Sequence, residues 1–303
     1  MNPMSSAYKI SQQHVRLSAE HPVRVERRPV VHAVQAHDHE FHEISVITRG
    51  SAVHATPAGR TAIRAGHAVV IPPGGVHAFE RIDGTEVINL YYLPEWLDAD
   101  LNLLWDEPGI VPLFCSGSLV RMKVDVQEMS LEDGAFAAVT QELDQLIAEL
   151  ARPKPGLAYL KSCFLKVLTL LARQWCRAFP GWRSTTASPV VRRALVAVER
   201  AIDEGEPFSV AAAADEARLS ADRYAAVFRE SVGYPPMEYY QRRRVQRACH
   251  LLIDANRSMT DIAMSLGFTD SPHFSRMFKA YRGLTPRAYR KTYINVRQRA
   301  ETL

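Results

Sequence analysis

The sequence predicts an α+β fold, in which a β-rich front half is followed by an all-helical last third. Three observations lead to this prediction. Short runs of alternating polar and apolar residues fill residues 22–92, and two stretches of helical periodicity follow between residues 131 and 178. Near the C-terminus, a pattern of aromatic, glycine and proline residues occurs twice at an offset of 50 positions.

The composition is that of an ordinary globular protein. Of the 303 residues, 47% are hydrophobic and 23% are charged, which argues against a disordered chain. No run of 18 apolar residues occurs, so we expect no membrane span. The first 20 residues contain no apolar segment typical of a secretory signal, and the four cysteines show no disulfide-framework spacing. We therefore expect a cytoplasmic protein with reduced thiols.

Charge and histidine are distributed unevenly along the chain. Residues 190–303 contain 19 Lys and Arg against 13 Asp and Glu, whereas residues 1–189 contain 18 against 20. Nine of the eleven histidines lie before residue 80. The segment GWRSTTASP at residues 181–189 is small and polar, as linkers are. We therefore expect one domain at residues 1–180, a linker at residues 181–189 and a basic domain at residues 190–303.

The alternating runs in residues 22–92 predict an antiparallel barrel or sandwich. Runs such as VRVER, FHEISVITR and EVINLYYL are separated by turn residues. His37, His39 and Glu43 share parity, so on one strand their side chains face the same way. Such groups are costly to bury without partners. Together with His77 they form a candidate site of three histidines and one glutamate for a divalent metal.

The spacing of these residues resembles the two motifs of the cupin family. The matching positions are His37, His39, Glu43 and Gly50 in the first motif, and Gly66, Pro72, Gly74 and His77 in the second. Arg81 stands where the second motif usually has Asn. The resemblance implies a small cupin-like β-barrel, in which the histidines hold a metal, hydrogen-bond a small ligand or bond to each other. Barrel interiors are common ligand sites, and the candidate effector-binding residues are His37, His39, Glu43, His77, Tyr91 and Trp96. Trp96 could instead belong to the core.

Residues 131–178 predict a helical hairpin. Apolar residues recur at helical spacing over residues 131–150 and about 156–178, and Pro153 and Pro155 interrupt the chain between them. Such a hairpin can pack against the sheet or form a dimer interface. The sequence leaves both interpretations open.

The C-terminal repeat predicts two helix-turn-helix units. The pattern Phe-x4-Gly-x2-Pro-x2-Tyr begins at Phe228 and again at Phe278. In each copy the aromatic residues anchor one helix, the glycine ends it in a left-handed conformation, and the proline starts the next helix. A short helix and a tight turn precede each copy, which completes the helix-turn-helix pattern.

A single helix is expected to connect the two units. Residues 236–253 carry one apolar stripe and would span about 27 Å. Such a rod could hold two recognition helices roughly one DNA turn, ~34 Å, apart. We expect its basic residues to lie near phosphates; they are Arg242, Arg243, Arg244 and Arg247.

Residues 190–291 resemble the AraC/XylS family of transcription regulators. The second unit carries the family's pattern most fully, with Ile262-Ala263, Gly267-Phe268, Phe274-Ser275-Arg276, Phe278-Lys279, Gly283, Thr285-Pro286 and Tyr289-Arg290. The first unit has Arg218 at the usual turn glycine and Tyr224 at the usual leucine. The resemblance implies a transcription regulator that binds promoter DNA, senses a small molecule (a sugar is one candidate) in its front domain and dimerises through that domain. It also implies contact with RNA polymerase.

The outward faces of the two second helices give the candidate DNA contacts. In the second unit, Arg276 is suited to a bidentate contact with guanine and Lys279 to a phosphate. In the first unit, Asp222 could accept from cytosine and the alanines could meet thymine methyl groups. The full candidate set is Asp222, Arg223, Ala225, Ala226, Arg229, Ser271, Pro272, His273, Ser275, Arg276 and Lys279.

A second hypothesis is a metal-dependent cupin enzyme, an isomerase or oxygenase, that carries a nucleic-acid-binding module. Its basis is the set of three histidines and Glu43. The sequence shows neither a nucleotide-binding glycine loop nor a convincing catalytic triad. We therefore favour a regulator over an enzyme, with no certain cofactor and a divalent metal as the one candidate.

Overall fold

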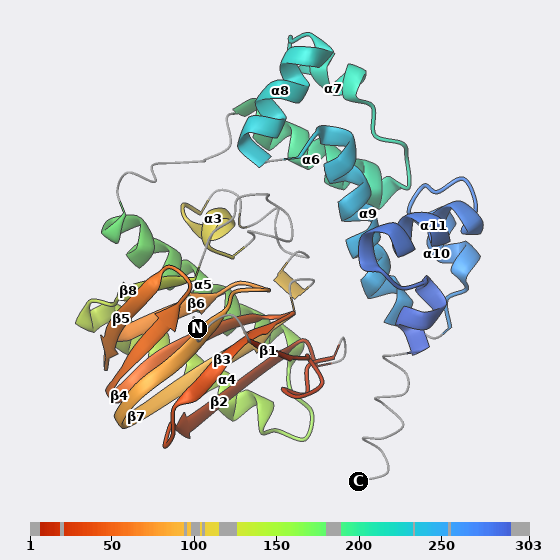
Figure 1. Cartoon of the computed structure of the whole chain (residues 1–303). Helices are drawn as coiled ribbons and strands as arrows, with labels where there is room; N and C mark the ends of the chain where they lie inside the picture. Colours follow the sequence, from red (N-terminus) through yellow and green to blue (C-terminus); the bar gives the residue numbers. More distant parts are fainter. Residues whose placement is uncertain are drawn as a thin grey trace.

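The protein is described by a computed structural model that covers residues 7–18, 21–93, 96–97, 104, 107–114, 126–179, 189–232, 234–253 and 256–291. Figure 1 shows a β-sheet with its covering helices, and a separate group of helices from residue 189 onward. This arrangement confirms the predicted α+β fold. Residues 181–188 of the predicted linker lie outside the described residues. Within the described residues, no helix is long and apolar enough to cross a membrane.

One sheet contains all the strands of the described residues. They are β1 (Tyr8–Ile10), β2 (Val23–Pro29), β3 (Val34–His39), β4 (His42–Thr56), β5 (Gly59–Arg64), β6 (His67–Ile71), β7 (His77–Tyr92) and β8 (Gln127–Ser130). Their order is β1-β3-β7-β4-β6-β8, with β2 also paired to β7 and β5 to β4. Every pairing is antiparallel except that of β1 with β3.

The two longest strands, β4 and β7, bend where their register shifts. The pairing slips between Ile47 and Val53, and Gly50 adopts a φ of 70° at this point. A Cβ on Gly50 would lie 2.3 Å from the Asp83 carbonyl oxygen, so only glycine allows the two backbones to approach this closely. The sequence predicts separate strands on either side of this point, whereas each pair of runs forms one continuous, kinked strand.

The bend rolls the sheet over on itself. Glu43 pairs in register with Tyr91, at the opposite end of β7 from His77. A straight strand would separate Tyr91 from His77 by about 46 Å, yet a carboxylate oxygen of Glu43 lies 3.9 Å from Nε2 of His77. The rolled sheet therefore encloses an interior in which distant parts of β4 and β7 meet.

Strand alternation separates this interior from a second, helix-covered face. On β7, Ile88, Leu90 and Tyr92 join the core with α4 (Asp133–Leu150) and α5 (Leu157–Ala178). Val87, Asn89 and Tyr91 line the interior instead. Tyr92 meets Phe164 of α5 edge to face, with ring centroids 4.9 Å apart. Packing of the hairpin on the sheet is thus confirmed, and α3 (Ile110–Phe114) packs against α5.

The C-terminal helices follow the predicted repeat. They are α6 (Pro189–Glu204), α7 (Val210–Glu216), α8 (Ala221–Val232), α9 (Pro236–Ile253), α10 (Met259–Ser265) and α11 (Ser271–Arg282), followed by a helical turn at 286–291. The connecting helix α9 has the predicted bounds. In Figure 1 it lies between the pair α7 and α8 and the pair α10 and α11.

Local side-chain chemistry fixes the helix ends. Ser209 and Ser258 cap α7 and α10, and Ser258 forms a reciprocal capping box with Asp261. Asp270 caps α11 by accepting from the backbone N–H of His273. Gly283 ends α11 with a φ of 73°, as the sequence predicts.

Candidate functional site

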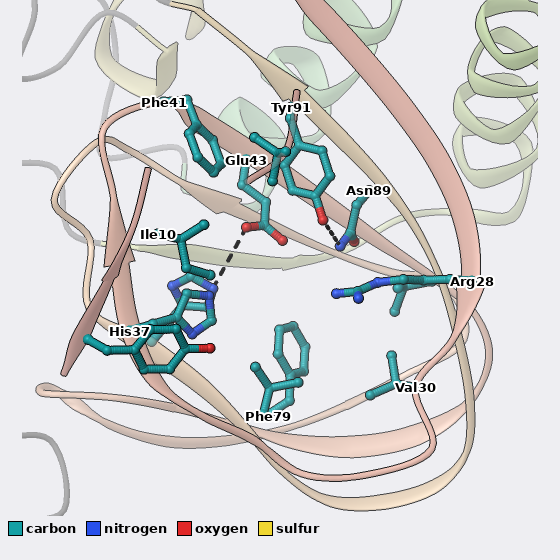
Figure 2. Close-up of a pocket in the computed structure, with 14 residues that line it drawn as sticks. Ile10, Arg28, Val30, His37, Phe41, Glu43, Phe79, Asn89 and Tyr91 are labelled. Carbon is teal, nitrogen blue, oxygen red and sulfur yellow. Dashed lines mark hydrogen bonds and ion pairs between the residues drawn. The ribbon is translucent and has the colours of Figure 1, made fainter. Parts of the chain in front are cut away.

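The interior of the rolled sheet contains a cavity of about 190 Å³. Its walls are largely apolar, with Val30, Val34, Phe79 and Val87 among them. Its polar lining, much of it shown in Figure 2, consists of Tyr8, Arg28, His37, Glu43, His77, Asn89 and Tyr91. A mostly apolar cavity with a few convergent polar groups is the usual form of a small-molecule site.

Backbone hydrogen bonds fix the ring orientation of three histidines at this cavity. Nδ1 of His37 lies 2.9 Å from the Gln35 carbonyl oxygen, Nδ1 of His39 2.7 Å from that of Phe41, and Nδ1 of His77 3.1 Å from that of Gly75. A carbonyl oxygen only accepts, so each Nδ1 carries a proton. In a neutral ring, Nε2 then presents a lone pair.

Burial keeps two of these rings neutral near pH 7. It lowers the pKa of His77 to about 3, and it also lowers the pKa of His37. Burial alone would raise the pKa of Glu43, but the surrounding imidazoles, first of all His39 through its hydrogen bond, outweigh burial and lower that pKa to about 2. The site therefore presents a carboxylate and two imidazole lone pairs.

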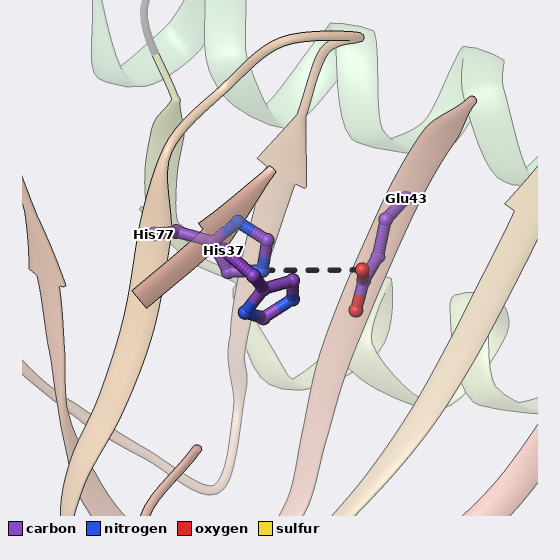
Figure 3. Close-up of side chains that lie close together, drawn as sticks. All are labelled: His37, Glu43 and His77. Carbon is purple, nitrogen blue, oxygen red and sulfur yellow. Dashed lines mark ion pairs between the residues drawn. The ribbon is translucent and has the colours of Figure 1, made fainter. Parts of the chain in front are cut away.

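These acceptor groups converge on one point. One nitrogen each of His37 and His77 and one oxygen of Glu43 lie within 4.8 Å of one another (Figure 3). Nε2 of His77 is buried without a hydrogen-bond partner among the described residues. Nδ1 donating to a carbonyl while Nε2 faces a cluster of ligand atoms is the arrangement found at metal-binding histidines. These three residues therefore fit a divalent cation.

The fourth predicted ligand, His39, lies beside this group and not in it. Its Nε2 lies 3.3 Å from a Glu43 oxygen, and its ring stacks on Phe41. The sequence placed His39 and Glu43 on one strand. In the structure β3 ends at His39 and β4 begins at His42, so the two side chains meet across a turn.

A second, hydrogen-bonded group covers another side of the cavity. Asn89 Nδ2 donates to the Tyr91 hydroxyl at 2.7 Å, and Ser45 Oγ lies 3.0 Å from Glu43 Oε1 and 2.8 Å from Asn89 Oδ1. Burial raises the pKa of Tyr91, which keeps its hydroxyl protonated. Tyr91 was predicted, whereas Asn89 and Arg28 were missed. A buried Asn within the apolar run EVINLYYL was the available sign.

Trp96 does not line the cavity, contrary to the prediction. The chain leaves β7 after Tyr92, and Trp96 lies on the helix-covered face. Its ring centroid is 4.5 Å from that of Phe164, and Lys161 Nζ lies 4.2 Å from the ring. It is a core residue.

His54 is a buried neighbour of the site that sequence reasoning missed. Its ring centroid lies 5.8 Å from that of His77, and its Nδ1 bonds to a carboxylate oxygen of Glu128. Glu128 belongs to β8, and the adjacent Gln127 accepts a hydrogen bond from the Trp175 indole of α5 at 3.1 Å. Strand β8 thus connects the histidine cluster to the helical hairpin.

The recognition helices have buried aromatic faces and exposed polar faces. Phe274 and Phe278 of α11, and Tyr224 and Phe228 of α8, are almost completely buried. The exposed candidates for DNA contact are Asp222, Arg223, Ala226, Arg229, Pro272, Arg276 and Lys279, with Ala225, Ser271 and Ser275 half-buried. His273 is also half-buried, and its ring meets Phe268 edge to face at 5.5 Å. Among the described residues, Arg276 and Lys279 have no acidic partner.

The arginines of α9 are used internally, which corrects the prediction that they lie near phosphates. Arg243 is buried and donates to both carboxylate oxygens of Glu199 on α6, at 2.5 and 2.9 Å. Arg244 is buried 3.5 Å from the centre of the Phe268 ring and donates to the Leu266 carbonyl at 2.7 Å. Arg242 pairs with Glu238 one turn earlier on α9, and Arg247 pairs with Asp203 of α6. Arg243, Arg244 and Arg247 thus connect α9 to the elements packed around it.

Known proteins resemble both parts of the chain. A family model for an AraC-like ligand binding domain matches residues 22–160, and one for a helix-turn-helix domain matches residues 213–292. The HTH-type transcriptional activator RhaR of Mannheimia succiniciproducens is 22% identical over 292 residues, covering 96% of this chain and 99% of its own. The activator RhaS of Escherichia fergusonii is 27% identical over 276 residues, covering 89% and 92%.

Solved structures include similar chains. ToxT from Vibrio cholerae is 12% identical with a TM-score of 0.41, covering 89% of this chain and 97% of its own. An AraC-type regulator from Chromobacterium violaceum is 27% identical with a TM-score of 0.34, covering 36% and 96%. The two family models together match more than two thirds of the sequence, and the RhaR and RhaS relatives are aligned over most of their length. The chain therefore belongs to the AraC family of DNA-binding transcription regulators, with a ligand-binding β-domain ahead of two helix-turn-helix units.

Proposed function

We propose that the protein is a cytoplasmic transcription activator whose binding to promoter DNA is controlled by a small molecule in the cavity of the rolled sheet. The observation that carries the proposal is the pair of recognition helices, each anchored by buried aromatic residues and each with an exposed polar face. Residues 1–180 then form the effector-binding domain, residues 181–189 the linker and residues 190–303 the DNA-binding domain.

In this proposal α8 and α11 enter the major groove. Arg276 is exposed and without an acidic partner among the described residues, so its guanidinium is available for a bidentate contact with guanine. Lys279, Arg223 and Arg229 contact phosphates, and Asp222 accepts from cytosine. In the same proposal Ala225 and Ala226 meet thymine methyl groups, and Ser271, Pro272 and Ser275 complete the face of α11 that meets the DNA. His273 covers Phe268.

Selection from random duplexes followed by gel-shift titration tests this assignment. Arg276→Ala should weaken binding to the selected site by about 1–3 kcal/mol and relax the preference at one base pair. Arg60→Ala is the matched control, because Arg60 is an exposed arginine of the β-domain paired with Glu80. Unchanged affinity and preference in Arg276→Ala would remove this residue from the interface.

We infer that the protein acts as a homodimer through the hairpin of α4 and α5. Leu157 and Tyr159 of α5 are 64% and 46% exposed, although both are large and apolar. Sedimentation of Leu157→Asp should shift the protein towards monomer, whereas Lys154→Asp, beside it in the exposed turn, should not. A dimer then presents four helix-turn-helix units to the promoter, where RNA polymerase is the expected further partner.

We also propose that the cavity binds a divalent cation through His37, Glu43 and His77, with His39 close by. The lone pairs that converge there support this assignment. A cation at this point would add positive charge and open coordination positions for effector oxygens. Thermal unfolding with Mn²⁺, Ni²⁺ or Zn²⁺ should show a shift in Tm that His77→Ala removes. The shift should remain in His67→Ala, which changes a half-buried histidine of β6 outside the cavity lining. Equal shifts in all three proteins would contradict it.

The cation site also keeps the enzyme hypothesis testable. The relatives named above are transcription regulators, which favours sensing over catalysis. Purified protein that loses its bound metal and still binds DNA in an effector-dependent way would support a sensor. Turnover of the bound small molecule would instead support a metal-dependent enzyme.

A further inference from the structure

The cavity contains one basic side chain, and its position restricts the chemistry of the effector. Arg28 is the only Lys or Arg among the described residues that line the cavity. It lies on β2 opposite Val87 of β7, and Figure 2 shows its side chain pointing into the cavity. The guanidinium thus faces the same enclosed space as Glu43.

Arg28 has only a weak internal partner. Among the described residues the nearest carboxylate is that of Glu26, 3.8 Å from Nε, and Glu26 already pairs with Arg24 at 2.8 Å. The Arg28 side chain is 50% exposed, so it lies at the mouth of the cavity and not in its depths. A planar guanidinium without a close carboxylate is suited to bidentate binding of a ligand carboxylate.

The deep end of the cavity favours hydrogen-bond donors on the ligand, whereas Arg28 at the mouth favours a ligand carboxylate. His37, His77 and Glu43 present acceptors there, and each is buried. Asn89 and the Tyr91 hydroxyl can both donate and accept. A ligand that fills this end must carry hydrogen-bond donors, such as hydroxyl groups, or bind through a cation held by the same three residues. The ligand therefore needs hydroxyl groups at one end and negative charge at the other.

Cavity size excludes long-chain ligands. A dry cavity of about 150 Å³ in another protein holds benzene, and the present one is only slightly larger at about 190 Å³. It accommodates a molecule built on five or six carbon atoms. A ligand with an ammonium group at the mouth would be repelled by Arg28, and a neutral sugar would leave the guanidinium without a counter-charge.

The electrostatics at Tyr91 agree with this placement. Burial is the main cause of the raised pKa of Tyr91; Glu43 raises it further and Arg28 lowers it. Both charges therefore act on the same hydroxyl, and Figure 2 shows Glu43, Tyr91 and Arg28 around one cavity. A ligand beside Tyr91 is within reach of both groups.

We propose that the effector is a small hydroxylated carboxylic acid of the sugar-acid class, with its carboxylate on Arg28 and its hydroxyl groups directed to Glu43, His77 and Asn89. This proposal rests on the assignment of the cavity as the effector site. It makes Arg28 the residue that distinguishes an acid from the corresponding neutral sugar.

Thermal unfolding of the full chain with matched ligands tests the proposal. The probes are D-glucuronate, D-galacturonate, D-gluconate and L-arabinonate, each with its neutral sugar, together with D-glucosamine as the cationic analogue and acetate as the control for bulk anions. At least one acid should raise the Tm, with a Kd about ten- to hundredfold below that of its neutral sugar, as expected for a charge-assisted hydrogen bond. Arg28→Gln should abolish this difference. Arg60→Gln should retain it.

Three results would overturn the proposal. They are a panel in which no acid raises the Tm, a neutral sugar that binds as tightly as its acid, and an acid preference that survives in Arg28→Gln. Gel-shift titration with the same ligands separates this failure from failure of the proposed function. A neutral sugar that binds in the cavity and changes DNA affinity would leave the regulator intact and refute the acid. An acid that binds through Arg28 without changing DNA affinity would support the acid as ligand and refute the proposed control of DNA binding.

Discussion

The buried ion pair between Arg243 and Glu199 joins α9 to α6, and its removal should destabilise the helical domain strongly. The two side chains are 6% and 10% exposed and share two hydrogen bonds of 2.5 and 2.9 Å. Arg243 also donates to Gln246 at 3.0 Å. Glu199→Leu would remove the carboxylate to which two nitrogens of the buried guanidinium donate. Loss of one partner from a buried pair costs about 3–5 kcal/mol.

Hydrogen exchange of the amides in α6 and α9 is the appropriate assay for this change. It reports the free energy of unfolding locally, whereas the described tryptophans Trp96 and Trp175 lie in the β-domain. The double variant Glu199→Leu/Arg243→Met should recover most of the loss, because an apolar pair of similar volume removes both buried charges. A single-variant loss below about 1 kcal/mol, as at a surface pair, would refute the reasoning.

Three further predictions concern backbone conformation and pH. Gly267→Ala should lower the free energy of unfolding by at least about 2 kcal/mol in urea titration, because φ is 69° and the new Cβ would lie 2.6 Å from the Gly205 carbonyl oxygen; an unchanged midpoint would refute this. Arg218→Gly should raise it by up to about 1 kcal/mol, because Arg218 has a φ of 55° at the equivalent turn, and a loss of stability would contradict that. Burial lowers the pKa of His42 and of His77 to about 3. Below about pH 6.5 the unfolded chain binds a proton at each of these histidines and the folded chain does not. As the pH falls from 6.5 to 4, the free energy of unfolding should therefore decrease by up to about 1.4 kcal/mol per pH unit for each histidine. His42→Phe should reduce that slope, and an identical slope in the variant would exclude His42 as a cause.

The C-terminal domain was predictable because its elements are specified locally. The offset of 50 between Phe228 and Phe278, the caps Ser220 and Asp270, and Gly283 each act within a few residues. Such signals survive without knowledge of the tertiary fold. The roles of Arg243 and Arg244 could not be predicted in this way, because their partners Glu199 and Phe268 come from distant parts of the sequence.

The cavity was only partly predictable for a related reason. Parity and spacing identified His37, Glu43 and His77, which the structure brings together. The bend at Gly50 that brings them together depends on how β4 pairs with β7, and no local sequence pattern predicts it. Arg28 was missed because an arginine on a strand is usually a solvated side chain, and only the rolled sheet gives it an interior to face.

Footprinting on a selected site tests the central claim most directly, namely that α8 and α11 occupy neighbouring grooves of one duplex. The account predicts that each chain protects two major-groove segments about one helical turn, 10–10.5 base pairs, apart. Phe278→Ala should abolish the protection from α11, since α11 depends on this buried anchor. A single protected segment per chain, or two segments unrelated to the helical repeat of DNA, would contradict the account.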